Sequence, residues 1–342
     1  MSQEHSLSKL HRKRGPKVVA LGGGTGLSTM LRGLKQYTEN ITAIVTVADD
    51  GGGSGVLRQD LGMPPPGDIR NCLLALSNIE PLMSELLGYR FTEGILKGQS
   101  FGNLFLAALN EISPSFDVAV QRMSEVLAIT GRVLPVTNED VNLEVEFENQ
   151  TRVVGESKIF QCKKEQDCRI RQLRMIPEHP KALEASLTAI READMIVFGP
   201  GSLYTSIIPN LLVDGIVSEI MQSDALKVYV CNVMTQEGET EDYSVSDHIS
   251  ALFRHAEEHI FDYCLINSKT IPEEVCARYE QEGAAPIVCD REACAELGVQ
   301  IIEKPVSLVC DGKVMHDPNA LGQELFNIYT EYGTVRIAEE TF

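Results

Sequence analysis

Two glycine-rich stretches, each following an apolar run, carry the residues of this chain that could do chemistry. Asp49 and Asp50 come at the end of one run and are followed by stretch 51–55, Gly-Gly-Gly-Ser-Gly. Stretch 22–26, Gly-Gly-Gly-Thr-Gly, follows another apolar run in the same way. Ligands of open α/β sheets bind outside the carboxyl ends of the strands. We therefore expect both stretches to line one crevice, with main-chain N–H groups inside and carboxylates at the rim.

Stretch 22–26 fits neither of two common phosphate-binding motifs. A dinucleotide fingerprint would need a third glycine at Leu27 or Thr29, and a Walker A loop would need a lysine directly after Gly26. Bare backbone at the start of a helix still suits an anion. The structural alternative is a tight turn between strand and helix, but the density of glycines favours ligand contact.

The roles of Asp49 and Asp50 stay open from the residues alone. The pair could bind a divalent metal, contact a ribose or base, or act as a general base, and the structural alternative is a turn or capping pair. Asp68 and Arg70 follow a stiff triple-proline loop, where Asp68 is expected to cap a helix over 69–76. Arg58 and Arg70 are the basic side chains expected to meet a phosphate.

A third stretch, 199–206, also follows a predicted buried strand. Its glycines, Gly199 and Gly201, expose backbone, and Ser202, Thr205 and Ser206 place hydroxyls at the start of a helix. This arrangement fits contact with a diphosphate without a lysine. The structural alternative is ordinary helix capping.

Short buried strands alternate with amphipathic helices along most of the chain, which predicts an α/β fold. The predicted strands are 17–21, 41–47, 195–198, 227–233 and 261–266, and the predicted helices include 69–76, 104–109, 118–129, 183–190 and 248–258. Alternating apolar and polar residues over 141–148 and a returning strand over 152–159 indicate a β-rich insertion, and Asp311-Gly312 predicts a hairpin turn.

We therefore expect a Rossmann-like, doubly wound and mainly parallel sheet with a small β-rich insertion. The expected divisions are a tail over 1–14, a nucleotide-binding core over 15–133 and 178–317, the insertion over 134–177, and a C-terminal helix and tail over 318–342.

The composition narrows the classes of partner. A net charge of −19 over 342 residues argues against binding to nucleic acid or to a membrane surface. Nine cysteines without a Cys-x-x-Cys motif indicate free thiols in a reducing compartment, with Cys162 and Cys168 the pair most open to a metal or redox role. No run has the length of a signal peptide or a transmembrane helix, so we expect a cytoplasmic protein without membrane insertion. The seven histidines form no metal-ligand pattern.

Five motifs, in order, resemble the YvcK branch of the CofD-like family. They are Gly-Gly-Gly-Thr-Gly-Leu at 22–27, Thr-Val-Ala-Asp-Asp-Gly-Gly at 46–52, Pro-Pro-Pro-Gly-Asp-Ile-Arg-Asn at 64–71, Gly-Pro-Gly-Ser-Leu-Tyr-Thr-Ser at 199–206 and Cys-Asn-Val-Met-Thr-Gln at 231–236. The resemblance implies a Rossmann-like nucleotide fold in the cytoplasm. It also implies binding of UDP-sugars such as UDP-N-acetylglucosamine and a role in cell shape and growth on gluconeogenic carbon sources. A related branch, 2-phospho-L-lactate transferase, transfers phospholactate with a divalent metal.

The resemblance also assigns residues. Asp50 matches the acidic residue that faces the acceptor in the transferase branch, and we keep it as a catalytic candidate, with Asp49, Asp68 and Arg70 as residues that orient a substrate or a metal. The implied nucleotide contacts are Gly23, Gly24, Thr25, Gly26, Gly199, Gly201, Ser202, Thr205, Ser206, Asn232 and Tyr279.

Two departures from the family pattern concern charge. Val56 stands where relatives commonly have arginine, and Met315 stands where they commonly have a basic residue before a His-Asp pair.

Three hypotheses remain: a nucleotide-sugar-binding regulator without turnover, a metal-dependent phosphotransferase for which Mg²⁺ is the candidate cofactor, and an NAD-binding oxidoreductase. The broken fingerprint counts against the third. A homodimer is a candidate assembly.

Overall fold

A seven-stranded parallel sheet forms the centre of the protein, whose computed structural model describes residues 15–166 and 168–333. The strands lie in the order β10-β9-β8-β7-β1-β2-β3. Their bounds are β1 Val18–Gly22, β2 Ile41–Val45, β3 Arg132–Pro135, β7 Met195–Phe198, β8 Leu226–Val230, β9 Tyr263–Asn267 and β10 Gln300–Lys304. The expected doubly wound α/β fold is confirmed, because the order β3-β2-β1-β7-β8-β9 is that of a Rossmann sheet.

The switch point of this topology lies between β1 and β7. From β1 the chain moves outward through β2 and β3, and it then returns to the other side of β1 with β7. Every residue of β1, β2 and β7 is buried, which explains why these strands are continuous apolar runs in the sequence. Ligands of such sheets bind in the crevice at the switch point.

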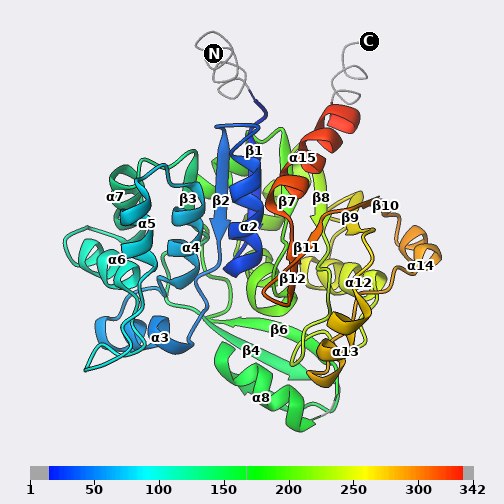
Figure 1. The fold of residues 1–342 in the computed structure, drawn as a ribbon, viewed down its shortest axis with the longest axis horizontal. Coiled ribbons are helices and arrows are strands. Elements are labelled where there is room, and N and C mark those ends of the chain that lie inside the picture. Colours follow the sequence, from blue (N-terminus) through cyan, green and yellow to red (C-terminus); the bar gives the residue numbers. More distant parts are fainter. Residues whose placement is uncertain (1–14, 167, 334–342) are drawn as a thin grey trace.

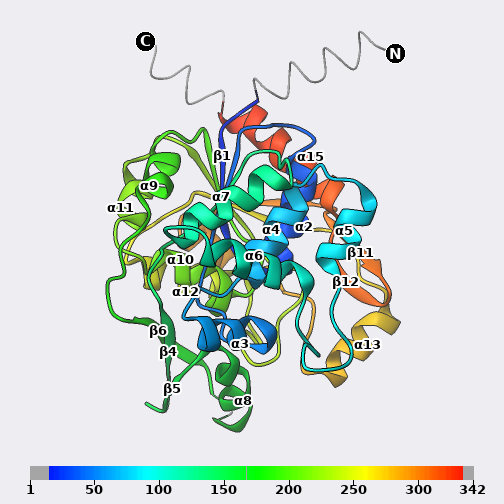
Figure 2. The same ribbon diagram turned by 90° about the vertical axis from the view of Figure 1, so that its left-hand side faces the viewer.

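Helices cover both faces of the sheet (Figures 1 and 2). One face carries α2, α4 and α15, and the other carries α9, α10, α11 and α12. The bounds are α2 Gly24–Leu34, α4 Gly67–Leu76, α9 Glu184–Arg191, α10 Ile208–Leu211, α11 Ile216–Gln222, α12 Val245–Ala256 and α15 Pro318–Ile328. The further helices are α3 Gly52–Leu61, α5 Pro81–Gly88, α6 Phe101–Glu111, α7 Phe116–Val126, α13 Glu273–Gln281, α14 Arg291–Glu296 and the π-helical turns η1 Leu203–Ile207 and η2 Tyr329–Gly333.

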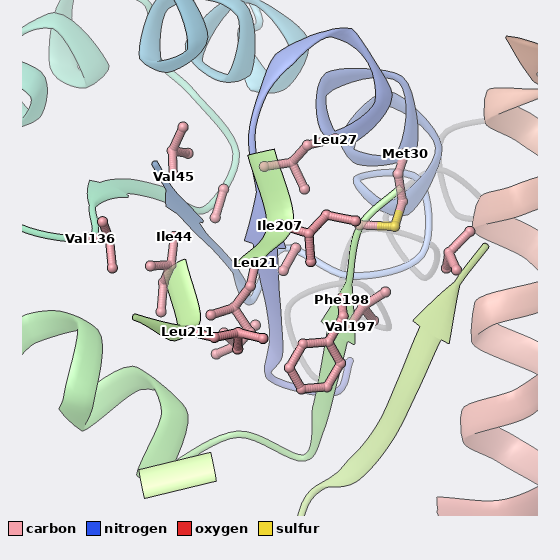
Figure 3. Close-up of a cluster of buried hydrophobic side chains, with 14 of the residues drawn as sticks. Leu21, Leu27, Met30, Ile44, Val45, Val136, Val197, Phe198, Ile207 and Leu211 are labelled. Atoms are coloured by element: carbon pink, nitrogen blue, oxygen red, sulfur yellow. The ribbon is translucent and has the colours of Figure 1, made fainter. Parts of the chain in front are cut away.

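The core joins the sheet to the helices that begin at the switch point. Leu21 and Phe198 on the strands pack with Leu27 and Met30 of α2 and with Ile207 of η1 (Figure 3). All five side chains are fully buried. The starts of α2 and η1 are therefore held rigidly at the ends of β1 and β7.

Helix α15 packs against α2 with no room for side chains at the contact. A Cβ built on Gly33 would lie 1.8 Å from the carbonyl oxygen of Pro318. Asp317 caps α15 by accepting hydrogen bonds from the N–H groups of Asn319 and Ala320. The segment beyond 317 thus belongs to the core of the fold as far as the structure describes it.

The β-rich insertion is a separate antiparallel sheet of order β5-β4-β6 that also holds a helix. Its strands are β4 Asn142–Phe147, β5 Arg152–Val154 and β6 Ile170–Ile176, and its helix is α8 Glu156–Gln166. The expected strand over 152–159 is wrong beyond Val154, because Gly155 turns with a φ of 109° and the next residue starts α8. Leu134 and Pro135 lie in β3 of the central sheet.

A hairpin follows the last strand of the central sheet. Strands β11 Ser307–Cys310 and β12 Lys313–His316 pair antiparallel across Asp311-Gly312, as predicted. Among the described helices, none has the length and apolar character needed to cross a membrane.

Candidate functional site

Two adjoining cavities lie at the switch point. The first, which we call the acidic cavity, has a volume of about 370 Å³ and is lined by Gly23, Gly24, Thr25, Gly26, Asp49, Asp68, Glu156, Gly201, Ser202, Thr205 and Ser206. These residues come from the carboxyl ends of β1, β2 and β7, from the start of α4 and from the start of α8. The sequence therefore predicted correctly that Asp49 and stretches 22–26 and 199–206 meet. The expectation that stretch 51–55 also lines the crevice is wrong, because these residues begin α3, and Glu156 was not expected.

The second cavity, the hairpin cavity, has a volume of about 430 Å³. Residues 232–236 after β8, Tyr279 of α13 and residues 313–316 of β12 form its walls. Four residues line both cavities: Thr25, Gly26, Gly201 and Ser202. The two cavities together form one cleft, which bends around the starts of α2 and η1.

The wall that the cavities share depends on close approach of two backbones. A Cβ built on Gly26 would lie 2.6 Å from the carbonyl oxygen of Pro200, so only glycine fits there. Helix α2 begins at Gly24, and its N-cap, Gly23, has no side chain to accept a hydrogen bond. The first N–H groups of a helix have no partner inside the helix, so the start of α2 is suited to an anion.

Asp68 lies at this helix start. The carboxylate accepts the N–H of Gly24, and a Cβ built on Gly23 would lie 2.5 Å from its Oδ2. Burial, and then the nearby Asp49, raise the pKa of Asp68 to about 6. The expected capping role is wrong, because α4 begins at Gly67 with Pro66 as its N-cap and Asp68 lies in the first turn.

Asp49 and Asp50 point to different parts of the molecule. Asp49 lines the acidic cavity, where its Oδ1 accepts the N–H of Gly51 at 2.8 Å. Asp50 lines neither cavity. Its Oδ1 accepts the N–H of Ser157 at 2.7 Å, at the start of α8. In this structure Asp49 faces the cleft, while Asp50 fixes the helix of the insertion.

Glu156 is the functional candidate that the sequence did not reveal. The residue follows Gly155, whose positive φ turns the chain, and α8 then directs its carboxylate to the acidic cavity. Burial first, and then the charges of Asp49 and Asp50, raise the pKa of Glu156 to about 8. A glycine between a strand pattern and a polar helix pattern was the signal that could have indicated this turn.

Polar partners hold two hydroxyls of stretch 199–206 in place. Thr205 donates to Glu239 Oε1 at 2.8 Å, and Ser202 donates to Gln236 Oε1 at 2.8 Å. Glu239 is fully buried, and its desolvation raises its pKa to about 7. Glu239 thus binds the loop from behind, where a motif search would not detect it.

Two predicted nucleotide contacts also stabilise the walls of the cleft. Asn232 exchanges two hydrogen bonds with Gly201, accepting from its N–H at 3.1 Å and donating to its carbonyl at 2.8 Å. The Tyr279 hydroxyl accepts the N–H of Val314 at 2.9 Å and so holds the hairpin in position. Both side chains line the hairpin cavity.

This ordered set of strand-end loops around one cleft matches a known family. The family model described as 2-phospho-L-lactate transferase CofD matches residues 18–307. The chain belongs to the CofD family. A protein from Thermoanaerobacterium thermosulfurigenes named "Putative gluconeogenesis factor" is 54% identical over 92% of this chain and 97% of its own length. The gluconeogenesis factor of Bacillus subtilis is 47% identical over 92% of this chain and 99% of its own length.

A solved structure agrees with the fold. The crystal structure of a UPF0052 family protein from Bacillus halodurans has a TM-score of 0.85 and 46% identity, and it covers 90% of this chain and 98% of its own. These relatives confirm the resemblance to the YvcK branch.

The two arginines expected at a phosphate lie outside both cavities of this CofD-family chain. Arg58 is buried and donates to Asp140 at 2.8 Å and to the carbonyl of Val141 at 2.5 Å. Arg70 donates to Ser100 and Asn71, and its guanidinium opposes the rise in the pKa of Asp68 from a distance. Both arginines fasten elements that surround the cleft.

The departures from the family pattern fall on different surfaces. Val56 is exposed on α3 and lines neither cavity, whereas Met315 lines the hairpin cavity. Lys313 lies two residues before Met315 on the same strand, and alternate residues of a strand share a face. Among the described residues, Lys313 is the only lysine or arginine that lines either cavity.

The carboxylates of the acidic cavity supply the oxygen ligands that Mg²⁺ prefers. Among the described residues, however, no group of three or more His, Cys, Asp or Glu side chains is arranged to hold a metal ion. Asp49, Asp68 and Glu156 therefore do not form a metal site built from protein ligands alone.

Proposed function

We propose that this CofD-family chain is a cytoplasmic regulatory protein that binds a nucleotide sugar, with UDP-N-acetylglucosamine as the ligand to test first. The proposal rests on one observation: two cavities of different chemistry join at the glycine backbone of Gly26 and Gly201. A nucleotide sugar likewise has two unlike ends joined by a diphosphate. Membership of the CofD family agrees with a nucleotide-like ligand.

The ligand would lie along the cleft in one direction. Its nucleoside would occupy the hairpin cavity beside Asn232 and Tyr279. The diphosphate would pass over the backbone of Gly26 and Gly201, where main-chain N–H groups stabilise an anion. The sugar would reach the acidic cavity, where its hydroxyls would donate to carboxylates.

The proposed role is binding without turnover, in support of cell shape and growth on gluconeogenic carbon sources. A relative named gluconeogenesis factor supports the second part of this role. The described cleft residues include no serine or cysteine paired with a histidine as an activated nucleophile. The alternative, a phosphotransferase, differs in that it would convert the bound ligand into a product.

Titration calorimetry with UDP-N-acetylglucosamine tests the proposal. We expect saturable binding by the wild-type protein in the presence of EDTA, with the ligand recovered intact by phosphorus NMR. An absence of heat at millimolar ligand, with the fold intact by circular dichroism, would overturn the proposed function. Cleavage of the ligand that requires added Mg²⁺ would instead favour the phosphotransferase.

A further inference from the structure

The two ends of the cleft carry opposite charge. Three carboxylates, those of Asp49, Asp68 and Glu156, line the acidic cavity, and no lysine or arginine accompanies them among its described lining residues. The hairpin cavity has the reverse composition, since Lys313 lines it and none of its described lining residues is acidic. A ligand that spans the cleft therefore meets a strong change of charge along its length.

The residues near Lys313 do not weaken this contrast. His316 lines the same cavity, and burial lowers its pKa to about 4, so it is neutral near pH 7. No hydrogen bond or ion pair of the Lys313 side chain is found within the described part of the chain. Its ammonium group is thus available to a ligand anion.

The acidic end already contains an anion at the place where a phosphate would bind. Asp68 accepts the N–H of Gly24, the first residue of α2, so this amide is occupied by a carboxylate of the protein. Above the pKa of Glu156, which is about 8, a phosphate at the end of a nucleotide would have to share the cavity with three carboxylates. Like charges in one buried site repel, whereas a carboxylate readily accepts a hydrogen bond from a neutral hydroxyl.

Glu156 cannot easily move away from such a ligand. Helix α8 is fastened at its start by the hydrogen bond from Ser157 to Asp50 and further along by the ion pair of Lys163 with Glu241 at 3.0 Å. A Cβ built on Gly238 would lie 2.2 Å from the ring of Phe160, so α8 also packs directly against the loop after β8. The backbone that carries Glu156 is therefore held in place.

We propose that this polarised cleft selects nucleotides that end in an uncharged, hydroxyl-bearing group and rejects nucleotides that end in a free phosphate. Asp49, Asp68 and Glu156 provide the rejection, and Lys313 holds the phosphate-bearing part of the ligand. This inference rests on the proposed function and adds to it the property by which the site distinguishes a nucleotide sugar from a bare nucleotide.

The test compares three ligands on one protein. The affinities of UDP-N-acetylglucosamine, UDP and UTP are measured by calorimetry at pH 9 in EDTA, so that Glu156, whose pKa is about 8, is ionised and no divalent metal masks the phosphate charge. We expect the wild-type protein to bind the sugar nucleotide at least about tenfold more tightly than UTP, the effect of one unfavourable charge contact. Equal affinity for the two would overturn the inference while leaving the proposed function intact. Binding of none of the three would overturn the proposed function itself.

Substitutions of single carboxyl groups test which residues discriminate between UTP and the sugar nucleotide. Glu156→Gln keeps the shape of the side chain and should tighten UTP binding about tenfold more than it changes sugar-nucleotide binding. Glu258→Gln removes the same charge from an exposed position outside both cavities and should change neither. If Glu156→Gln does not fold, Asp49→Asn provides the same test. An unchanged ratio in a folded variant contradicts the role of the carboxylates.

A second pair of variants tests whether Lys313 contacts the phosphate of the ligand. Lys313→Ala should weaken all three ligands by a similar factor of about five to ten, because each has phosphate, and it should reduce the dependence of affinity on salt. Lys181→Ala, at an exposed position outside the cleft, is the matched control. Wild-type affinity in Lys313→Ala would exclude this lysine as the phosphate contact.

Discussion

Two glycine stretches that look alike in the sequence have different environments in the fold. Stretch 22–26 ends β1 at the switch point, and four of its residues line the acidic cavity. Stretch 51–55 follows β2, one strand away, and lines neither cavity. It instead starts α3, and a Cβ on Gly55 would lie 2.0 Å from the carbonyl oxygen of Asp50. Glycine density thus indicates close backbone approach, and only the fold shows whether a ligand or another part of the chain is approached.

The same contrast separates the two neighbouring aspartates. Asp49 has its carboxylate at the cavity, while Asp50, one residue later, holds the insertion. The wall that both cavities share is glycine backbone, whereas the carboxyl groups of the acidic cavity come from other elements. Mutations in the shared wall and in the elements that carry these carboxyl groups should therefore have different consequences.

The largest effect is expected at the shared backbone wall. Gly26→Ala places a methyl group 2.6 Å from the carbonyl oxygen of Pro200, which forces the two loops apart. We expect a loss of about 1–3 kcal/mol in the free energy of unfolding and at least a hundredfold loss of nucleotide-sugar affinity. Denaturant titration and calorimetry measure the two quantities. Gly55→Ala should destabilise the fold as well, but its folded fraction should bind within a few-fold of wild type.

The next largest effect is expected where helix α8 of the insertion is attached to the loop after β8. Lys163 is buried beside Glu241, whereas Lys164 makes a similar ion pair with Glu237 at 2.9 Å on the surface. Lys163→Ala leaves Glu241 partly buried without its partner and should lower stability by about 1–3 kcal/mol. Lys164→Ala should cost less than about 1 kcal/mol. Equal costs in urea unfolding would contradict the view that α8 is anchored through Lys163.

The two aspartates give a smaller and more selective pair of effects. Asp50→Ala removes the acceptor for the N–H of Ser157 and should cost about 1 kcal/mol, as for other helix caps. Asp49→Asn keeps an acceptor for Gly51 and should change ligand affinity with little change in stability. A result in which Asp50→Ala alters affinity and Asp49→Asn does not would reverse the assignment.

The last expected effect is a pH dependence of stability, which depends on the carboxyl groups of the acidic cavity. The pKa of Glu156 is raised to about 8 and that of Asp68 to about 6, from ordinary values of 4.5 and 3.8. The folded protein therefore holds more protons than the unfolded chain between these values, and its stability falls as pH rises from about 4 to about 8. Urea midpoints across this range should show the decline, and Glu156→Gln should flatten the part between pH 6 and 8. A slope unchanged by that variant would show that Glu156 ionises normally.

Local chemistry explains the correct predictions. Buried parallel strands read as continuous apolar runs, so β1, β2 and β7 were found without knowing their neighbours. The hairpin turn at Asp311-Gly312 was likewise predicted from two residues. These features depend on short segments whose backbone preference agrees with their place in the fold.

The errors concern residues whose partners lie far away in the chain. Arg58 is held by Asp140, and Asp68 meets Gly24. Glu156 reaches the cavity because α8 begins earlier than the strand pattern indicated. Patterns within short sequence segments do not show which distant residues come into contact.

The sequence by itself determined the alternation of strands and helices, the family, and the meeting of stretches 22–26 and 199–206 at the switch point. These properties follow from hydrophobic periodicity and backbone freedom, which act over a few residues. Only the tertiary structure decided that Asp49 and not Asp50 faces the cleft and that Glu156 also lines it. It also decided that, among the described residues, Lys313 is the one lysine or arginine that lines the cleft. The physical reason is that charge acts through space, and the fold sets which charges share a buried site.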